Sequence, residues 1–184
     1  MILGSFRELR KQHPTLLLVI VPRHPERFAR VARLCERSGL QVALHSECTG
    51  DLPPTVDVLV GNTMGELYKF YAAADVAFIG GSLVRHGGHN LVEAMVVGVP
   101  TVFGPHIFNF EQSSNIALQN GAATQVRNAA ELAGAISSYL DDPELHAQAA
   151  RAATKVIHDN RGSLQATQDL IRRTVTALGP CVHN

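Results

Sequence analysis

Short, largely aliphatic runs that alternate with helical segments constrain the fold of this 184-residue chain more than any other feature. The first run, Leu16–Val21, has no polar residue, which is typical of a parallel strand covered on both faces. Later runs lie at Leu40–Leu44, Val56–Val60, Val76–Ile79, Val99–Phe103 and Ala122–Val126. The alternation predicts an α/β fold, a Rossmann-like parallel sheet of about six strands flanked by helices.

The remainder of the chain is predicted to be helical. From about residue 128 onward the pattern indicates only helices, the last of them at residues 163–178. Because 46% of the residues are hydrophobic, the chain can bury one sizeable core, and we expect residues 1–184 to form a single domain. The first residues show no clear beginning of a fold, so we expect the domain to come from a longer protein.

Charge and apolar content narrow the possible functions. Lys plus Arg and Asp plus Glu each total 16, so the bulk charge gives no argument for a nucleic-acid partner. Residues 1–40 hold eight basic and three acidic side chains, which suits an anionic membrane surface as well as plain solvation. No apolar run is long enough to cross a bilayer, and three scattered cysteines predict reduced thiols in a cytosolic protein.

A glycine-rich stretch after the fourth aliphatic run, Gly80–Asn90, predicts an anion site. The pair Gly80–Gly81 leaves the strand, and the pair Gly87–Gly88 allows close backbone approach to a ligand. A helical segment follows, and N–H groups at a helix start attract phosphate. An ordinary strand–helix connection commonly uses one glycine, so two pairs favour a phosphate-bearing ligand.

Parallel sheets bind ligands beyond the carboxyl ends of their strands, which draws attention to two more groups of residues. Arg23, His24 and Arg27 follow the first strand, where a fixed arginine can pair with a phosphate. Glu93 lies one turn into the helix after the glycine stretch, where a carboxylate can accept hydrogen bonds from ribose hydroxyls. The alternatives are a solvated helix start for the arginines and a glutamate favoured by the helix dipole.

Other kinds of chemistry are disfavoured by the same residues. His86 and His89 have a zinc-like spacing, but no cysteine or acidic pair completes four ligands, so we expect no metal. Ser82 lacks the G-x-S-x-G context of a nucleophile. The glycines also fail the G-x-G-x-x-G pattern of dinucleotide-binding dehydrogenases.

Three segments, in this order along the chain, resemble 3-deoxy-D-manno-octulosonic acid (Kdo) transferases. They are Val21–Arg27, Gly61–Leu67 and Gly80–Phe110, and the last includes Gly98-Val-Pro100 and Gly104-Pro-His106. The resemblance covers about residues 14–126. It departs from the family pattern at Arg85, where proline is usual, and at Leu91–Ala94, where a Pro-Leu-Glu-Pro-like run is usual.

The resemblance implies a GT-B glycosyltransferase with two Rossmann-like halves, of which this chain would be the carboxyl-terminal, donor-binding half. It implies transfer of Kdo from CMP-Kdo to a lipid A precursor in lipopolysaccharide biosynthesis, with inversion and without a metal or other cofactor. The general base of the family is a glutamate of the amino-terminal half, so no catalytic residue is expected here. The lipid substrate implies a peripheral position on the cytoplasmic face of the bacterial inner membrane.

The resemblance also assigns contacts with the nucleotide sugar. It places N–H groups of Gly87–Asn90, with Ser82 and Arg23, around the leaving phosphate, and Glu93 on the ribose. It places Met64 and Pro105–His106 around the cytosine. The full set of expected contact residues is Arg23, His24, Arg27, Met64, Gly81, Ser82, Gly87, Gly88, His89, Asn90, Glu93, Pro105, His106, Asn109 and Gln112.

Two other functions remain open at this point. The chain could be a GT-B domain for a uridine sugar nucleotide, or a non-catalytic docking module in which the basic helix at residues 26–37 and the final helices contact a partner. Preference for CMP, preference for UDP or no nucleotide binding separates the three hypotheses.

Overall fold

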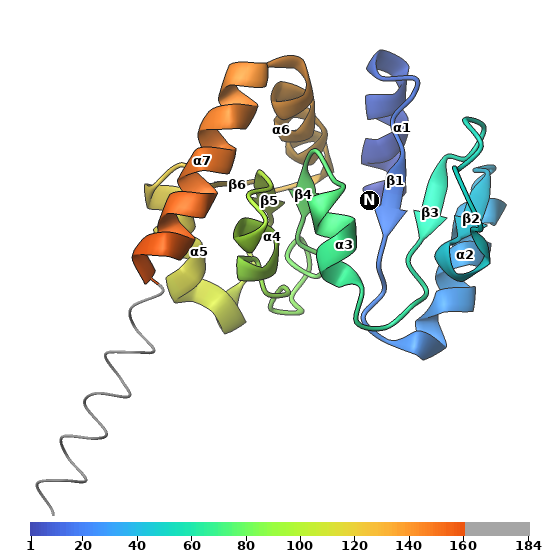
Figure 1. The fold of residues 1–184 in the computed structure, drawn as a ribbon, viewed down its shortest axis with the longest axis horizontal. Coiled ribbons are helices and arrows are strands. Elements are labelled where there is room, and N and C mark those ends of the chain that lie inside the picture. The colour runs from blue at the N-terminus through green and yellow to red at the C-terminus, as the bar shows by residue number, and fades with distance from the viewer. Residues whose placement is uncertain (161–184) are drawn as a thin grey trace, which may run out of the picture.

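The computed structural model describes residues 1–160, which form two parallel three-stranded sheets flanked by helices (Figure 1). One sheet has the order β1-β3-β2 and consists of Leu18–Ile20, Val58–Val60 and Val42–Leu44. The other has the order β4-β5-β6 and consists of Ala77–Phe78, Thr101–Phe103 and Ala123–Gln125. The α/β prediction is confirmed, because every strand pair is parallel.

The predicted six-stranded sheet is divided between β1 and β4. Figure 1 shows the strands in the order β6-β5-β4-β1-β3-β2 across the molecule, but no backbone hydrogen bond joins β1 to β4 within residues 1–160. We call this boundary the seam. β1 is thus an edge strand and is only partly buried, so the prediction that Leu16–Val21 is covered on both faces is wrong. The central strands β3 and β5 are buried throughout.

Helices and short 3-10 turns connect the strands. The α-helices in the described part of the chain are α1 Ile2–Gln12, α2 Phe28–Arg37, α3 Leu67–Ala72, α4 Val92–Val96, α5 Glu111–Gln119, α6 Ala129–Asp141 and α7 Pro143–Asn160. The 3-10 turns are η1 Pro25–Arg27, η2 His45–Glu47 and η3 Phe108–Phe110. The helix predicted at residues 163–178 lies outside the described residues.

Apolar side chains from α4, β5 and α7 hold the glycine-rich stretch in place. Ile79 and Leu91, the residues at its two ends, are buried together with Met95 and Phe103 in one cluster. Each of these four side chains is at most 1% exposed. The stretch is therefore anchored at both ends by side chains that remain out of water, while residues 84–86 between them are exposed.

The carboxyl ends of β1, β3, β4 and β5 all lie at one edge of the molecule, the lower edge in Figure 1. Residues 21–24 lead from β1 to η1 and α2, and residues 61–66 lead from β3 to α3. Residues 79–91 lead from β4 to α4, and residues 104–107 lead from β5 to η3. The predicted contact residues are concentrated in and just after these four connections.

Candidate functional site

The glycine-rich stretch is covered by the segment that follows β5. Gly87 and Gly88 have positive φ angles of 84° and 66°, which favour glycine. A Cβ atom on Gly87 would lie 2.7 Å from the Phe108 ring and would also collide with the Asn109 amide. A Cβ atom on Gly88 would lie 3.3 Å from the His106 carbonyl oxygen. The close approach that these glycines permit is therefore an approach by residues 106–109 of the chain itself.

Ser82 joins these two segments from the inside. Its side chain is fully buried, and its Oγ donates to the Ile79 carbonyl at 2.5 Å and accepts from the Gly104 N–H at 2.7 Å. The Ser82 carbonyl oxygen accepts from the His106 N–H at 2.9 Å. The hydroxyl that was expected to contact a phosphate is thus used within the fold, and Ser82 shapes the site rather than facing a ligand.

Arg23 and His89 meet across the seam. Arg23 follows β1, His89 follows β4, and Arg23 Nη1 lies 3.5 Å from His89 Nδ1. Because a guanidinium group can only donate, this contact requires a neutral imidazole that accepts at Nδ1. Both side chains are exposed at the surface. Parallel sheets bind ligands beyond the carboxyl ends of their strands, and this rule correctly predicts that a cation after β1 of the first sheet lies beside the glycine stretch after β4 of the second sheet.

The charges around His89 favour its neutral form. Partial burial is the largest cause that lowers the pKa of His89, and Arg23 is the next. His24 and Arg27 lower the pKa further, whereas Glu93 raises it. An anion that enters this cluster would meet several positive charges from the β1 side and the polar N–H of the imidazole.

Asn90 and Glu93 form the start of α4. The Asn90 Oδ1 accepts from the Val92 N–H at 3.1 Å, and the Asn90 Nδ2 donates to Glu93 Oε1 at 3.3 Å. Glu93 is partly buried, and it helps burial raise the pKa of Tyr71 to about 12. Tyr71 comes from α3, so Glu93 lies close to an aromatic side chain that is not among the residues predicted from the sequence.

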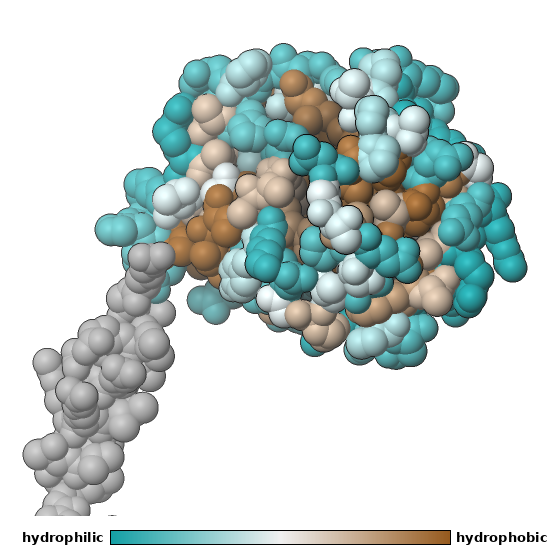
Figure 2. All heavy atoms as spheres, turned by 45° about the vertical axis from the view of Figure 1, so that its right-hand side comes forward, coloured by the Kyte–Doolittle hydropathy of each residue, from teal (hydrophilic) through white to brown (hydrophobic). Residues whose placement is uncertain are grey.

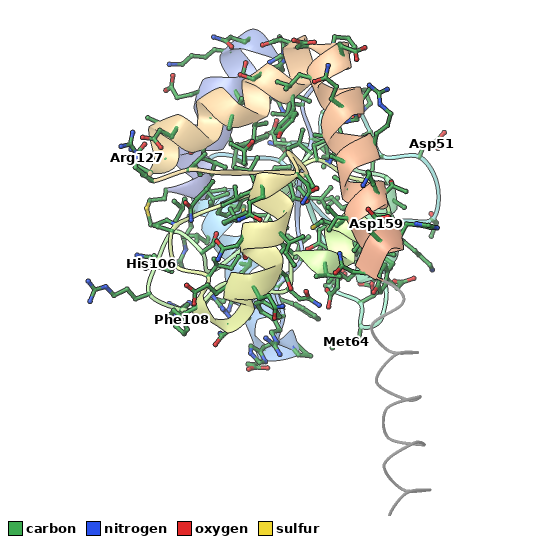
Figure 3. All side chains as sticks on the ribbon, turned by 90° about the vertical axis from the view of Figure 1, so that its left-hand side faces the viewer. Asp51, Met64, His106, Phe108, Arg127 and Asp159 are labelled. Carbon is green, nitrogen blue, oxygen red and sulfur yellow. The ribbon has the colours of Figure 1, made fainter. Side chains whose placement is uncertain are left out.

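Met64 lies apart from the other residues expected around the cytosine. Its side chain is 66% exposed on the segment between β3 and α3. Figure 3 shows it far from His106 and Phe108, which lie near each other at the other side of the same edge. The structure therefore does not bring Met64 together with His106, although both segments follow strands of the molecule.

A network of polar contacts holds the Met64 segment. Asn62 accepts from the Ser46 N–H at 2.9 Å, and Glu66 lies 2.5 Å from Lys69 and 3.3 Å from His45. The hydrogen bond from Lys69 is the largest cause that lowers the pKa of Glu66 to about 2. Glu66 is thus a charged anchor of this segment at neutral pH.

The remaining predicted residues come from the segment after β5. Pro105 and Asn109 are exposed, and His106 is half-buried. Gln112 is exposed in the first turn of α5. Phe108, 64% exposed, was not among the predicted contacts although its ring lies against Gly87. An exposed aromatic residue beside a glycine-rich stretch is a signal that could have identified it.

Two kinds of feature are absent from residues 1–160. No group of three or more His, Cys, Asp or Glu side chains in that range is arranged to hold a metal ion. None of the helices in the same range combines the length and apolar content that crossing a membrane requires.

Comparison with known proteins shows the family of this chain. Residues 1–156 match the family model of group 1 glycosyl transferases. The 3-deoxy-D-manno-octulosonic acid transferase of Haemophilus influenzae is 39% identical over 173 residues, which are 93% of this chain and 40% of that protein. The enzyme of the same name from Bordetella pertussis is 36% identical over 169 residues, which are 92% of this chain and 40% of that protein.

A solved structure shows the same fold. It is the crystal structure of the C-terminal CMP-Kdo binding domain of WaaA from Acinetobacter baumannii, with a TM-score of 0.79 and 34% sequence identity. The match covers 85% of this chain and 81% of that domain. This chain spans 40% of the length of each of the two transferases named above. The chain therefore belongs to the group 1 glycosyltransferases, in which it is a relative of the carboxyl-terminal half of Kdo transferases.

Proposed function

We propose that this chain is the donor-binding half of an inverting glycosyltransferase that transfers Kdo from CMP-Kdo to a lipid A precursor in lipopolysaccharide biosynthesis. The observation that carries the proposal is the meeting of Arg23 with His89 beside the glycine stretch, 3.5 Å apart across the seam. This arrangement offers positive charge and backbone donors to one anion. The similarity to the C-terminal CMP-Kdo binding domain of WaaA supports the choice of that anion.

In the proposed mechanism the chain stabilises the leaving group. When the bond between the sugar and CMP breaks, the phosphate of CMP gains negative charge. Arg23 and the N–H groups of Gly87–Asn90 stabilise that charge, and His24 and Arg27 add to the positive field. The Ser82 hydroxyl is not given a role toward the phosphate in this proposal, because its one proton is donated to the Ile79 carbonyl oxygen within the fold.

Glu93 holds the ribose in this proposal. Its carboxylate is partly buried and already accepts one hydrogen bond from Asn90, which leaves acceptor capacity for vicinal hydroxyls. The segment after β5, with His106, Asn109 and Gln112, is proposed to contact the base and the sugar. Met64 lies away from His106 (Figure 3), so the two residues would contact different parts of the nucleotide.

The reaction needs a partner half. The general base is proposed to be a glutamate of an amino-terminal half of the same protein, and the transfer is proposed to need no metal or other cofactor. The lipid acceptor makes a peripheral position at the cytoplasmic face of the inner membrane the proposed location. This chain alone is expected to bind CMP and to transfer no sugar.

Calorimetric titration with CMP, CTP and UDP tests the proposal. We expect CMP to bind more tightly than UDP. Glu93→Ala should weaken CMP binding about ten- to a hundredfold, because a hydrogen bond to a charged group is lost. Glu47→Ala is the matched control, since Glu47 is exposed in η2 and has no ion pair within residues 1–160. Preference for UDP would point to a uridine sugar nucleotide, and no binding of any nucleotide to a docking module.

A further inference from the structure

α2 carries a row of arginines that have no acidic partners. The segment Arg27–Arg37 contains four arginines and a single acidic residue, Glu36. Arg30, Arg33 and Arg37 are exposed, and within residues 1–160 none of them forms an ion pair or a side-chain hydrogen bond. Elsewhere in that range most basic side chains are ion-paired, namely Arg10, Lys11, Lys69, Arg127, Arg151 and Lys155.

The helix geometry places these arginines on one face. Ala32 and Cys35 are the buried residues of α2, and they turn the opposite side of the helix outward. Arg30, Arg33 and Arg37 are spaced by three and four residues, so they lie on that outer side together. With Leu34, which is 58% exposed, they line a shallow surface hollow of about 390 Å³.

The charge of this face extends beyond the helix. The Arg7 guanidinium donates to the Ser38 carbonyl oxygen at the end of α2 and adds a positive charge there. Arg27 lies directly before the first residue of α2, where its charge also acts on His89. Figure 2 brings the α2 side of the molecule forward and shows hydrophilic side chains along its right-hand edge.

A row of unpaired arginines repels itself and gives the fold no compensating contact. The charges are stabilised when they meet phosphate groups, which guanidinium groups bind well. Leu34 in the middle of the row is suited to the apolar boundary beneath lipid headgroups, as on helices that lie flat on membranes. A purely polar polyanion would give Leu34 no such environment.

We propose that the outer face of α2, formed by Arg30, Arg33, Leu34 and Arg37, docks on an anionic lipid bilayer. This inference rests on the proposed function, because a lipid acceptor requires the enzyme to work at a membrane. α2 begins at the edge of the molecule where Arg23 and His89 meet. Docking through α2 would therefore hold that edge beside the bilayer in which a lipid acceptor resides.

Co-sedimentation of the 184-residue chain with lipid vesicles tests the inference. We expect binding to vesicles of phosphatidylcholine with phosphatidylglycerol, none to phosphatidylcholine alone, and weaker binding as salt rises. Replacing Arg30, Arg33 and Arg37 together with glutamine should weaken binding about a hundredfold. Leu34→Ser should weaken vesicle binding about tenfold, because the apolar contact of Leu34 with the bilayer is lost.

The matched control removes the same charge elsewhere. Replacing Arg127, Arg151 and Lys155 together with glutamine removes three exposed, ion-paired cations and should leave vesicle binding nearly unchanged. Equal losses in the two triple variants would overturn the inference, because bulk charge would then explain the binding. Binding to a polyanion such as poly(U) without binding to anionic vesicles would overturn it as well.

Titration with CMP separates this inference from the proposed function. The Arg30, Arg33 and Arg37 triple variant should bind CMP as the unmodified chain does, because these residues lie outside the proposed donor site. An unmodified chain that binds CMP but not anionic vesicles overturns the docking face and leaves the proposed function standing. A chain that binds vesicles through α2 but binds no CMP supports the docking face and overturns the proposed donor.

Discussion

Gly104, the first residue after β5, has no room for a side chain. A Cβ atom there would lie 2.5 Å from the Ser82 carbonyl carbon and 2.6 Å from the Leu83 nitrogen. Both are backbone atoms, which cannot move aside as the end of a side chain can. We expect Gly104→Ala to lower the free energy of unfolding by about 3 kcal/mol, measured by urea denaturation.

Gly134→Ala is the control for this substitution. Gly134 lies inside α6 and has no atom within 4 Å of the position of a new Cβ atom. Alanine favours helix over glycine, so this variant should be more stable by up to about 1 kcal/mol. If Gly104→Ala were as stable as Gly134→Ala, the close packing of residues 82–83 on Gly104 would be refuted.

His89 should make stability depend on pH. Because the fold lowers the pKa of His89, the unfolded chain takes up this proton first as the pH falls. The contribution of His89 to stability is complete above the ordinary histidine pKa of about 6.5 and is lost as the pH falls from there through the lowered pKa.

Arg23→Gln tests the electrostatic part of this effect. Removing the guanidinium that faces His89 Nδ1 should raise the pKa of His89, followed by NMR of the imidazole during a pH titration. Arg30→Gln should leave it unchanged, since Arg30 is not among the groups that act on His89. An unaltered pKa in Arg23→Gln would mean that Arg23 is not a cause of the lowered pKa.

At the scale of elements, Ser82 couples the segment after β4 to the segment after β5. Replacing it with alanine leaves the buried Gly104 N–H without its acceptor at 2.7 Å. We expect Ser82→Ala to reduce the free energy of unfolding by about 1–3 kcal/mol. A change in CMP affinity without a loss of stability would instead show that the hydroxyl faces the ligand.

The elements themselves could largely be predicted from the sequence. The aliphatic runs predict the positions of the strands. Because parallel strands have their carboxyl ends at one edge of the sheet, the sequence also predicts that Arg23 lies near His89. The role of Ser82 could not be predicted, because its partners include Gly104 from a strand connection further along the chain. The partial burial of β1 could not be predicted either, since an aliphatic run does not specify which strand lies beside it.

At the scale of the whole molecule, the proposed donor site draws on both sheets. Arg23 belongs to the β1 side, and Gly88–Glu93 belong to the β4 side. We expect CMP to slow hydrogen exchange of the amides of β1, while those of β5, buried at the centre of its sheet, change little. Equal slowing in β1 and β5 would indicate general stabilisation instead.

Because the seam separates the two sheets, a bound nucleotide would change the stiffness of the domain as well as take part in the reaction. No backbone hydrogen bond joins β1 to β4 in the described residues, and the contacts between the two halves include those of α1 with α6, such as the hydrogen bond from the Ser5 hydroxyl to the Ala129 carbonyl oxygen at 2.8 Å. In the proposed function, a donor held by Arg23 on one side and by the glycine stretch on the other would add a cross-link between the two sheets at the carboxyl ends of their strands. The stiffness of the domain then depends on whether donor is bound, so a lipid surface or a second protein half would meet a more rigid partner when there is a sugar to transfer.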